Sequence, residues 1–316
     1  MPLPITAALD PATYPDLTAH DTVTVVIFGD SGVAETFPEV ATAAAKACFE
    51  GREHACDLGL MLGDNVYPSG MLTPADDAWK ASFARPMAPF VERARGEARF
   101  RVWVTAGNHD WNHRVNPAGE ERIRAAIDTT SSAANAELGG LWQEPALVVA
   151  VPGLPAWLHL LAVDTQTVVS GSGGEVLAAV MSELKASPEP AWDVVAGHHV
   201  PASTGPHAAS KERDDEVWSA ALDLMRPHGL DLVLAGHDHH QELLVTAGLP
   251  VVVVGNSSKG RDVVETPYAP CSRWSRAGTE GLGFAIVTFT RDRADLEFHD
   301  TLGNVVHRAE LAPLGP

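Results

Sequence analysis

Side chains that commonly bind metal ions gather in a few short motifs of this 316-residue sequence. The stretch LAGHDHHQEL, residues 234–243, contains His237, His239 and His240 after a glycine. Four more residues of this kind each follow a short apolar run and a glycine; they are Asp30, Asp64, Asn108 and His198. Imidazole, carboxylate and amide groups are ligands of first-row metals, so this distribution indicates a metal site.

Each of these motifs also has an ordinary structural interpretation when it is taken alone. Asp30 could cap a helix, and Asp64 or Asn108 could lie in a turn without any ligand. His198 could be a buried histidine whose nitrogens are satisfied by hydrogen bonds. The joint occurrence of five Gly-ligand turns, each at the end of an apolar run, favours a metal site, because glycine allows the backbone and the ion to approach closely.

The number of candidate ligands points to two metal ions. Two aspartates, one asparagine and three histidines are more than one tetrahedral ion needs, and the mixture suits first-row metals rather than calcium. We therefore expect two ions bridged by a carboxylate. Two ions about 3.5–4 Å apart can clamp a phosphoryl group for in-line displacement, and a metal-bound water reaches a pKa of about 7. The chemistry indicated is phosphate ester hydrolysis.

The elements that carry these residues read as an α/β fold. Short valine-rich runs bounded by Gly or Asp are typical of buried strands. These runs are residues 23–30, 58–64, 100–110, 158–164, 192–199, 231–240 and 250–258. Helical patterns at 34–50, 173–187 and 215–229 alternate with them. In such a fold ligands gather outside the carboxyl ends of the strands, where the candidate residues lie.

Residues 281–311 change character and read as three strands joined by the turns TRDRAD and TLGN. This pattern predicts an antiparallel meander, so the sheets should be mixed. His237 and His239 alternate along the predicted end of a strand, and we therefore expect both to project to one side.

Composition limits the partners. The net charge of −19 and the pI near 5.0 argue against binding to nucleic acid or to anionic membranes. A phosphate site in such a chain must create its own positive field, and metal cations do this compactly. No apolar run approaches the roughly 20 residues of a membrane span, and the N-terminus lacks a signal-peptide pattern. We expect a cytoplasmic protein, or a secreted one if a leader was removed, that acts on a small phosphate ester; the oligomeric state is not indicated.

Cysteine usage argues against a disulfide framework. The three cysteines are odd in number and do not have metal-ligand spacing. A bond between Cys48 and Cys56 is the one alternative that their spacing leaves open.

The motifs GDSG, GDNVY, GNHD, VAGHH and GHDHH, in this order, resemble the calcineurin-like metallophosphoesterase superfamily. Within it they look most like the purple acid phosphatases of the short, tartrate-resistant type. The stretches LGDNVYPSG, AGNHDWNH, VVAGHHVPASTGPH and GLGFAIVTF also read like that group, so the resemblance covers roughly residues 23–311. It implies a four-layer α/β/β/α sandwich of two mixed sheets flanked by helices. It also implies a single domain at 23–316 after an N-terminal extension at 1–22.

The resemblance further implies two metal ions that share the carboxylate of Asp64. An iron(III) would be held by Asp30, Asp64, Tyr67 and His239. A second ion, which varies in the family among iron(II), zinc and manganese, would be held by Asp64, Asn108, His198 and His237. Tyr67 is the discriminating residue, because phosphodiesterases and protein phosphatases of the superfamily generally have no tyrosine ligand there. Iron(III) would deprotonate its phenol, whose free pKa is about 10, and colour the protein.

Two further histidines are implied to act on the substrate. His109 matches the residue proposed in the family as general acid or transition-state stabiliser. His207 matches a second substrate-facing histidine, although it could also be a solvated loop residue. The neighbours of the ligands, Asp110, His199 and His240, are interpreted as groups that orient the site. The expected reaction is hydrolysis of phosphate monoesters by in-line attack of a metal-bound hydroxide.

Two other functions remain open on the sequence. One is a phosphodiesterase of the same superfamily that uses no tyrosinate. The other is a non-catalytic metal-binding scaffold on the same fold, which the complete set of ligand positions disfavours. The substrate is not indicated, although Trp79, Trp111 and His207 are candidates for stacking on an aromatic or sugar leaving group.

Overall fold

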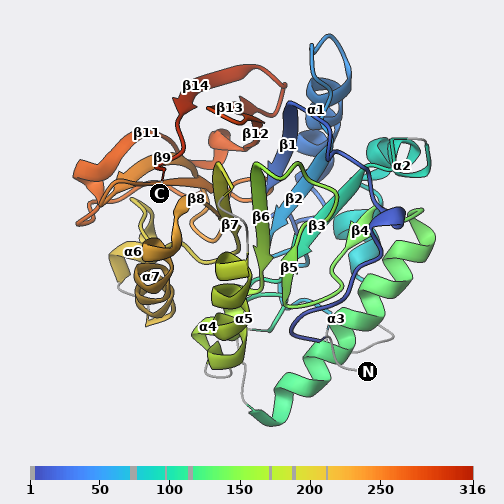
Figure 1. The fold of residues 1–316 in the computed structure, drawn as a ribbon, viewed down its shortest axis with the longest axis horizontal. Coiled ribbons are helices and arrows are strands. Elements are labelled where there is room, and N and C mark those ends of the chain that lie inside the picture. The colour runs from blue at the N-terminus through green and yellow to red at the C-terminus, as the bar shows by residue number, and fades with distance from the viewer. Residues whose placement is uncertain are drawn as a thin grey trace.

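The computed structural model describes residues 4–71, 77–96, 98–112, 117–170, 173–186, 190–210 and 213–315. Within these ranges the strands form two mixed seven-stranded sheets that pack face to face, with helices on both outer sides (Figure 1). The expected four-layer α/β/β/α sandwich is confirmed. No helix among the described residues has the length and apolar composition that crossing a membrane requires.

The first sheet has the strand order β14-β13-β12-β1-β2-β3-β4. Its parallel strands are β1 (Thr22–Phe28), β2 (Leu58–Leu62), β3 (Arg101–Thr105) and β4 (Trp142–Gln143). Its antiparallel strands are β12 (Gly283–Thr290), β13 (Ala294–Asp300) and β14 (Val305–Leu311). The predicted C-terminal meander is therefore confirmed, and it extends the sheet beyond β1.

The second sheet has the order β11-β9-β10-β8-β7-β6-β5. Its parallel strands are β6 (Leu158–Val163), β7 (Trp192–Ala196), β8 (Leu230–Ala235) and β10 (Leu249–Val254). Its antiparallel strands are β5 (Val148–Ala150), β9 (Gln241–Thr246) and β11 (Ser272–Arg276). The apolar runs predicted the four parallel strands, which are buried on both faces and so read as continuous runs.

Helices α1 (Phe37–Phe49) and α2 (Ala88–Arg95) cover the first sheet, and α4 (Thr165–Val169), α5 (Gly173–Ala186) and α7 (Arg213–Met225) cover the second (Figure 1). The other helical segments are η1 (Pro11–Thr13), the π-helix η2 (Lys80–Ala84), α3 (Pro117–Glu137), α6 (Pro206–Ser210), η3 (Arg226–His228), η4 (Ala269–Cys271) and η5 (Thr279–Gly281). The core between the sheets is formed by inward-facing strand residues such as Val25, Ile27, Leu60, Leu160 and Val194.

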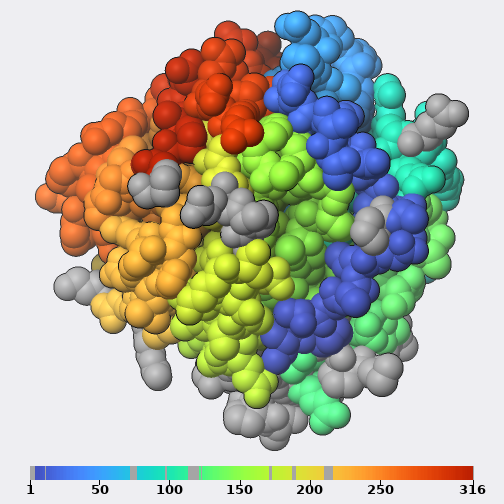
Figure 2. Space-filling view, viewed as in Figure 1, coloured from blue at the N-terminus to red at the C-terminus, as the bar shows by residue number. Residues whose placement is uncertain are grey.

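The first described residues pack onto the domain. The carbonyls of Pro4 and Ile5 accept hydrogen bonds from the β5 region, and Leu17 N donates to Gly153 O at 2.8 Å. Leu17 is 5% exposed and belongs to the core between the sheets. In Figure 2 this N-terminal segment, in dark blue, runs along the surface beside the green residues. The boundary of the domain at residue 22 stays a prediction.

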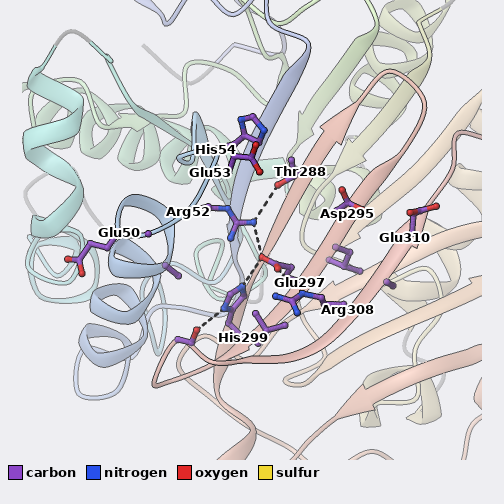
Figure 3. A pocket seen from close by; sticks show the side chains of 16 residues that line it. Glu50, Arg52, Glu53, His54, Thr288, Asp295, Glu297, His299, Arg308 and Glu310 are labelled. Carbon is purple, nitrogen blue, oxygen red and sulfur yellow. Dashed lines mark hydrogen bonds and ion pairs between the residues drawn. The ribbon is translucent and has the colours of Figure 1, made fainter.

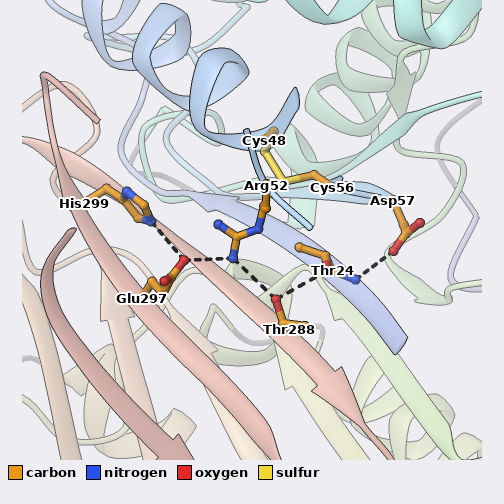
Figure 4. The surroundings of a disulfide bond; sticks show 8 residues. All are labelled: Thr24, Cys48, Arg52, Cys56, Asp57, Thr288, Glu297 and His299. Carbon is orange, nitrogen blue, oxygen red and sulfur yellow. Dashed lines mark hydrogen bonds and ion pairs between the residues drawn. A yellow bond between two sulfur atoms is a disulfide. The ribbon is translucent and has the colours of Figure 1, made fainter. Parts of the chain in front are cut away.

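Cys48 and Cys56 form a disulfide bond, the one pairing that the sequence left open (Figure 4). Cys48 lies in the last turn of α1 and Cys56 precedes β2, which places their Cα atoms 5.0 Å apart. The backbone N–H of Cys56 also donates to Cys48 O at 3.2 Å. The number of cysteines could not show that the chain after α1 turns back and places Cys56 beside Cys48. Cys271 is the free cysteine.

The loop closed by this disulfide carries Arg52 into a cavity of about 700 Å³ against the β12–β14 meander (Figure 3). Arg52 donates to Glu297 Oε2 at 2.8 Å, and Arg308 donates to Glu297 Oε1 at 3.0 Å. The hydrogen bond with His299, and then Arg52 and Arg308, hold the pKa of Glu297 below its ordinary value. Glu297 and the two arginines therefore pair with one another, which indicates a structural role for this cluster.

Candidate metal centre

The carboxyl ends of the parallel strands of both sheets converge on one site. Asp30 follows β1, Asp64 follows β2, Asn108 follows β3, His198 follows β7 and His237 follows β8. Three of these residues adopt left-handed backbone conformations: φ is 54° at Asp30, 55° at Asp64 and 67° at His237. Such conformations cost a non-glycine residue about 1–3 kcal/mol and cluster at functional sites.

The glycines before the candidate ligands leave space that other atoms fill, and at Gly63 and Gly107 the nearest atom belongs to another ligand. A Cβ atom on Gly63 would lie 2.6 Å from Nδ1 of His198, and one on Gly107 would lie 2.3 Å from Oδ1 of Asp64. At Gly236 it would lie 2.7 Å from Leu62 O. These glycines therefore let the two sheet edges approach closely.

The first group of donor atoms surrounds the phenol of Tyr67. Its Oη lies 2.9 Å from Asp30 Oδ1 and 2.8 Å from Asp64 Oδ2, and 3.4 Å from His239 Nε2. His239 Nε2 is also 3.1 Å from Asp30 Oδ1. Burial first, and then the negative charges of Asp30 and Asp64, raise the pKa of Tyr67 well above its ordinary value. A phenolate at this position therefore requires a cation beside it.

The second group surrounds the imidazole of His198. Its Nε2 lies 2.9 Å from Asn108 Oδ1, 3.1 Å from His237 Nδ1 and 3.5 Å from Asp64 Oδ1. Its Nδ1 donates to Leu62 O at 2.8 Å, which leaves Nε2 as the nitrogen with a lone pair in the neutral ring. Asp64 thus presents one carboxylate oxygen to each group.

Both groups fit a metal ion. Donors about 2.0–2.2 Å from an ion, at right angles to one another, lie about 2.8–3.1 Å apart, which matches most of the separations found here. Ligand atoms of Asp30, Asp64 and His198 all lie within 4.8 Å of one another. Burial raises the pKa of Asp30. The charge of His239 and its hydrogen bond lower that pKa by more, so the net shift is downward. The donor chemistry and the spacing could hold two cations that share Asp64.

The structure brings all seven predicted metal ligands into these two groups, but it corrects the local geometry of two. His237 and His239 do not lie on a strand, because β8 ends at Ala235 and β9 begins at Gln241. They reach the site from the turn between these strands, where the left-handed conformation of His237 redirects the chain. The predicted alternation along a strand is therefore not the reason why both histidines reach the site.

The two predicted catalytic histidines flank the donor groups. His109 Nδ1 lies 2.6 Å from Pro68 O and therefore donates to it, while its Nε2 is 3.8 Å from Asp64 Oδ2. The ring of His207 stacks on that of His237 with centroids 4.0 Å apart. His207 lies in the short helix α6 rather than in an irregular loop.

Residues around the ligands fix the turns. The carboxylate of Asp110 accepts the backbone N–H groups of Asn65, Val66 and Gly107 at 2.9–3.1 Å. Burial first, and then the charge of Asp64, raise the pKa of Asp110 to about 7. Through these hydrogen bonds Asp110 orients the turn that carries Asp64. His199 Nδ1 lies 2.8 Å from Thr165 Oγ1, and His240 Nε2 lies 3.0 Å from Glu242 Oε2.

The sequence interpretation missed the stretch NSSKGRD, residues 256–262, which follows β10. Ser258 Oγ donates to Asp30 O, and Lys259 Nζ lies 4.1 Å from the ring centroid of Tyr67. Arg261 reaches His207. The stretch includes Asn256 after a glycine and Asp262, but lysine and arginine are not metal-ligand types, so only the structure could place Lys259 and Arg261 at the site. The suggestion that Trp79 or Trp111 stacks on a leaving group is wrong, because both are buried in the core.

Comparisons with known proteins agree with this geometry. A family model described as calcineurin-like phosphoesterase matches residues 23–241. Purple acid phosphatase 17 of Arabidopsis thaliana is 24% identical over 299 residues, which cover 90% of this chain and 83% of that protein. Purple acid phosphatase 4 of the same plant is 24% identical over 283 residues, with coverages of 84% and 76%.

Two solved structures share the fold at low identity. The purple acid phosphatase PPD1 of yellow lupin superposes with a TM-score of 0.62 at 15% identity, over 95% of this chain and 55% of that one. GAP50, the anchor in the inner membrane complex of Plasmodium, superposes with a TM-score of 0.67 at 15% identity, over 92% of this chain and 89% of that one. One fold therefore occurs in a phosphatase and in an anchoring protein, and the side chains of the site must decide the function.

Proposed function

This chain belongs to the calcineurin-like phosphoesterase family, and from that membership we propose that it hydrolyses phosphate monoesters at a dinuclear centre of the purple acid phosphatase type. Iron(III) would be held by Asp30, Asp64, Tyr67 and His239. A divalent iron, zinc or manganese ion would be held by Asp64, Asn108, His198 and His237. Two such ions would lower the pKa of water and neutralise the charge of the phosphoryl group.

One observation carries the proposal of this type: the phenol oxygen of Tyr67 lies between Asp30 Oδ1 and Asp64 Oδ2, at 2.9 and 2.8 Å. The same oxygen lies 3.4 Å from His239 Nε2, so atoms of the three other predicted ligands of this ion surround it. Burial and the two carboxylates oppose ionisation of the phenol, so a phenolate at this position would need a highly charged cation such as iron(III) beside it.

The protein's own groups would orient the substrate and move one proton. The Nδ1–H of His109 is held by Pro68 O, so its Nε2 is the atom that faces the site. A protonated Nε2 there can donate to the oxygen of the leaving group as the bond to phosphorus breaks. The backbone N–H of His109 donates to Asp64 Oδ1 at 2.9 Å, which ties the position of this acid to that of the shared carboxylate.

His207 is less suited to the proton transfer. Arg261 Nη1 lies 2.9 Å from His207 Nε2, and since a guanidinium can only donate, the Nε2 must accept. That nitrogen carries no proton while the contact lasts. We therefore assign the proton transfer to His109 and a contact with the phosphoryl oxygens to His207.

The test is a comparison of hydrolysis rates for 4-nitrophenyl phosphate and bis(4-nitrophenyl) phosphate between pH 4 and 9, on protein loaded with iron plus zinc or manganese. We expect a strong preference for the monoester with an acid optimum. A preference for the diester near neutral pH would contradict the proposal and favour a phosphodiesterase. Absence of turnover with a full metal content would favour the scaffold.

A further inference from the structure

A basic segment that no motif indicated lies beside the candidate metal centre. We call residues 257–264 the basic strap. Three backbone hydrogen bonds tie it to elements of the site: Ser257 N to Gly29 O at 3.0 Å, Arg261 N to His239 O at 2.8 Å and Val264 N to Thr204 O at 2.8 Å. A fourth joins Gly278 N to Arg261 O at 2.9 Å. The strap is therefore fixed relative to the predicted ligands.

The strap presents two cations beside the two donor groups. Lys259 Nζ lies 4.1 Å from the ring centroid of Tyr67, beside the first donor group. Arg261 Nη1 lies 2.9 Å from Nε2 of His207, whose ring stacks on His237 of the second group. The two cations are two residues apart in the chain, and each contacts a residue of, or packed against, one of the two donor groups.

Within the described residues, neither Lys259 nor Arg261 has a carboxylate oxygen within ion-pair distance. The contact with His207 uses one of the five N–H donors of Arg261, which leaves others for a ligand. A net charge of −19 repels anions at long range, and these two side chains oppose that field at the site.

We propose that Lys259 and Arg261 bind a second anionic group of the substrate, carried by the leaving group next to the ester oxygen. The inference rests on the proposed function and deepens it: the preferred substrates are monoesters whose leaving group bears a carboxylate or a phosphate. In the reaction the phosphorus gains the oxygen of water, and its bond to the ester oxygen breaks. That oxygen keeps the electron pair and receives one proton.

The kinetic test uses a matched pair of substrates, 2-phosphoglycolate and ethyl phosphate, which differ by one carboxylate on the leaving group. In Lys259→Met and Arg261→Met, kcat/KM for 2-phosphoglycolate should fall about 10- to 100-fold more than kcat/KM for ethyl phosphate, the range for a hydrogen bond to a charged group. Inorganic diphosphate, measured in parallel, shows whether a phosphate serves as well as a carboxylate. Equal losses on all substrates, or no loss, would overturn the inference.

Lys46→Met and Arg291→Met are the charge-matched controls. Both side chains are exposed, one on α1 and one in the turn after β12. Residue 291 follows Thr290, which pairs with Thr22 at the opposite end of β1 from the site. These variants remove the same charge, and we expect the ratio of the two kcat/KM values to stay unchanged.

A binding measurement keeps the inference distinct from the proposed reaction. Calorimetry with 3-phosphonopropionate and propylphosphonate, which cannot be hydrolysed, reports the second anion without turnover. The two strap variants should lose most of the difference in Kd between these ligands. If the wild-type protein shows this difference but hydrolyses no monoester, the reaction is wrong and the anion site stands. If the wild-type protein shows no difference, the inference fails whatever the activity.

Discussion

At the residue scale, the types of the candidate ligands were predictable because each one stands in a short motif after a glycine. Tyr67 was predictable only through the resemblance, since a tyrosine three residues after an aspartate has no signal of its own. Lys259 and Arg261 could not be predicted, because their position depends on how the segment after β10 returns over Asp30 and His239. The sequence alone does not show that this segment folds back onto the site.

His109 should act mainly on leaving groups that need a proton. In His109→Gln, kcat for ethyl phosphate should fall by about 10²- to 10⁴-fold, the usual contribution of a general acid. The loss for 4-nitrophenyl phosphate should be much smaller, because its phenolate leaves without protonation. Steady-state rates on the two substrates check this, with the exposed His20→Gln as the control. Equal losses would mean that His109 has a structural or binding role instead.

At the scale of elements, the apolar runs predicted the long parallel strands, because burial on both faces makes them continuously hydrophobic. They did not predict β9 or β11, whose residues include Gln241 and Glu242 at the buried edge beside the site. They also missed α3, where threonine, serine and alanine dilute the apolar stripe. Strands that bury polar residues, and helices without a regular apolar stripe, are therefore hard to predict from the sequence.

The Gly63 turn should tolerate no side chain. In Gly63→Ala the Cβ would lie 2.6–2.8 Å from the ring of His198, which Leu62 O holds in place. We expect loss of metal content together with a lower free energy of unfolding. Gly51→Ala is the matched control, because φ is +70° there but no atom lies within 4 Å. It should cost only the left-handed strain, about 1–2 kcal/mol, and keep both metals.

Measured metal content and urea unfolding separate the two effects. If Gly63→Ala bound metal normally and lost no more stability than Gly51→Ala, crowding against His198 would not be the reason why residue 63 must be glycine.

Asp164, which ends β6 and caps α4, should make stability depend on pH. Its oxygens accept Thr167 N at 3.1 Å and Trp111 Nε1 at 2.8 Å, and burial raises its pKa to about 7. The folded state then holds a proton that the unfolded state releases near pH 4, so stability falls as the pH rises from about 4 to 7. Each pKa unit of difference contributes about 1.4 kcal/mol.

Asp164→Asn removes this titration. Relative to the wild-type protein, the variant should therefore become more stable as the pH rises. Thermal unfolding at pH 5 and pH 8 checks the sign; a relative stability that is the same at both values would contradict it.

At the scale of the whole molecule, the fold class and the mixed sheets followed from alternating strands and helices and from the C-terminal meander. The convergence of two sheets on one site did not follow from any single motif. It depends on contacts between the two sheets, such as Ser257 N to Gly29 O at 3.0 Å and His198 Nδ1 to Leu62 O at 2.8 Å. The disulfide between Cys48 on α1 and Cys56 before β2 is a further tertiary contact that no single motif indicated.

The disulfide should stabilise the molecule without affecting the site, because it lies at the end of α1 remote from the ligands. Closing a loop of this length contributes about 2–3 kcal/mol by the loop-entropy estimate. Cys48→Ala/Cys56→Ala should lower the free energy of unfolding by that amount and leave kcat unchanged, whereas Cys271→Ala should change neither. Urea unfolding with and without a reductant is the check, and a wild-type protein insensitive to reductant would count against the bond.

The central claim is that the phenol of Tyr67 binds iron(III) in the centre that performs the hydrolysis. The most direct test is the visible absorption spectrum of the iron-loaded protein, compared with that of Tyr67→Phe. The other two tyrosines supply the controls Tyr14→Phe and Tyr268→Phe. We predict a visible band in the wild-type protein and in both controls that is lost in Tyr67→Phe, with a lower monoesterase rate. A band and a rate that survive Tyr67→Phe would contradict the account.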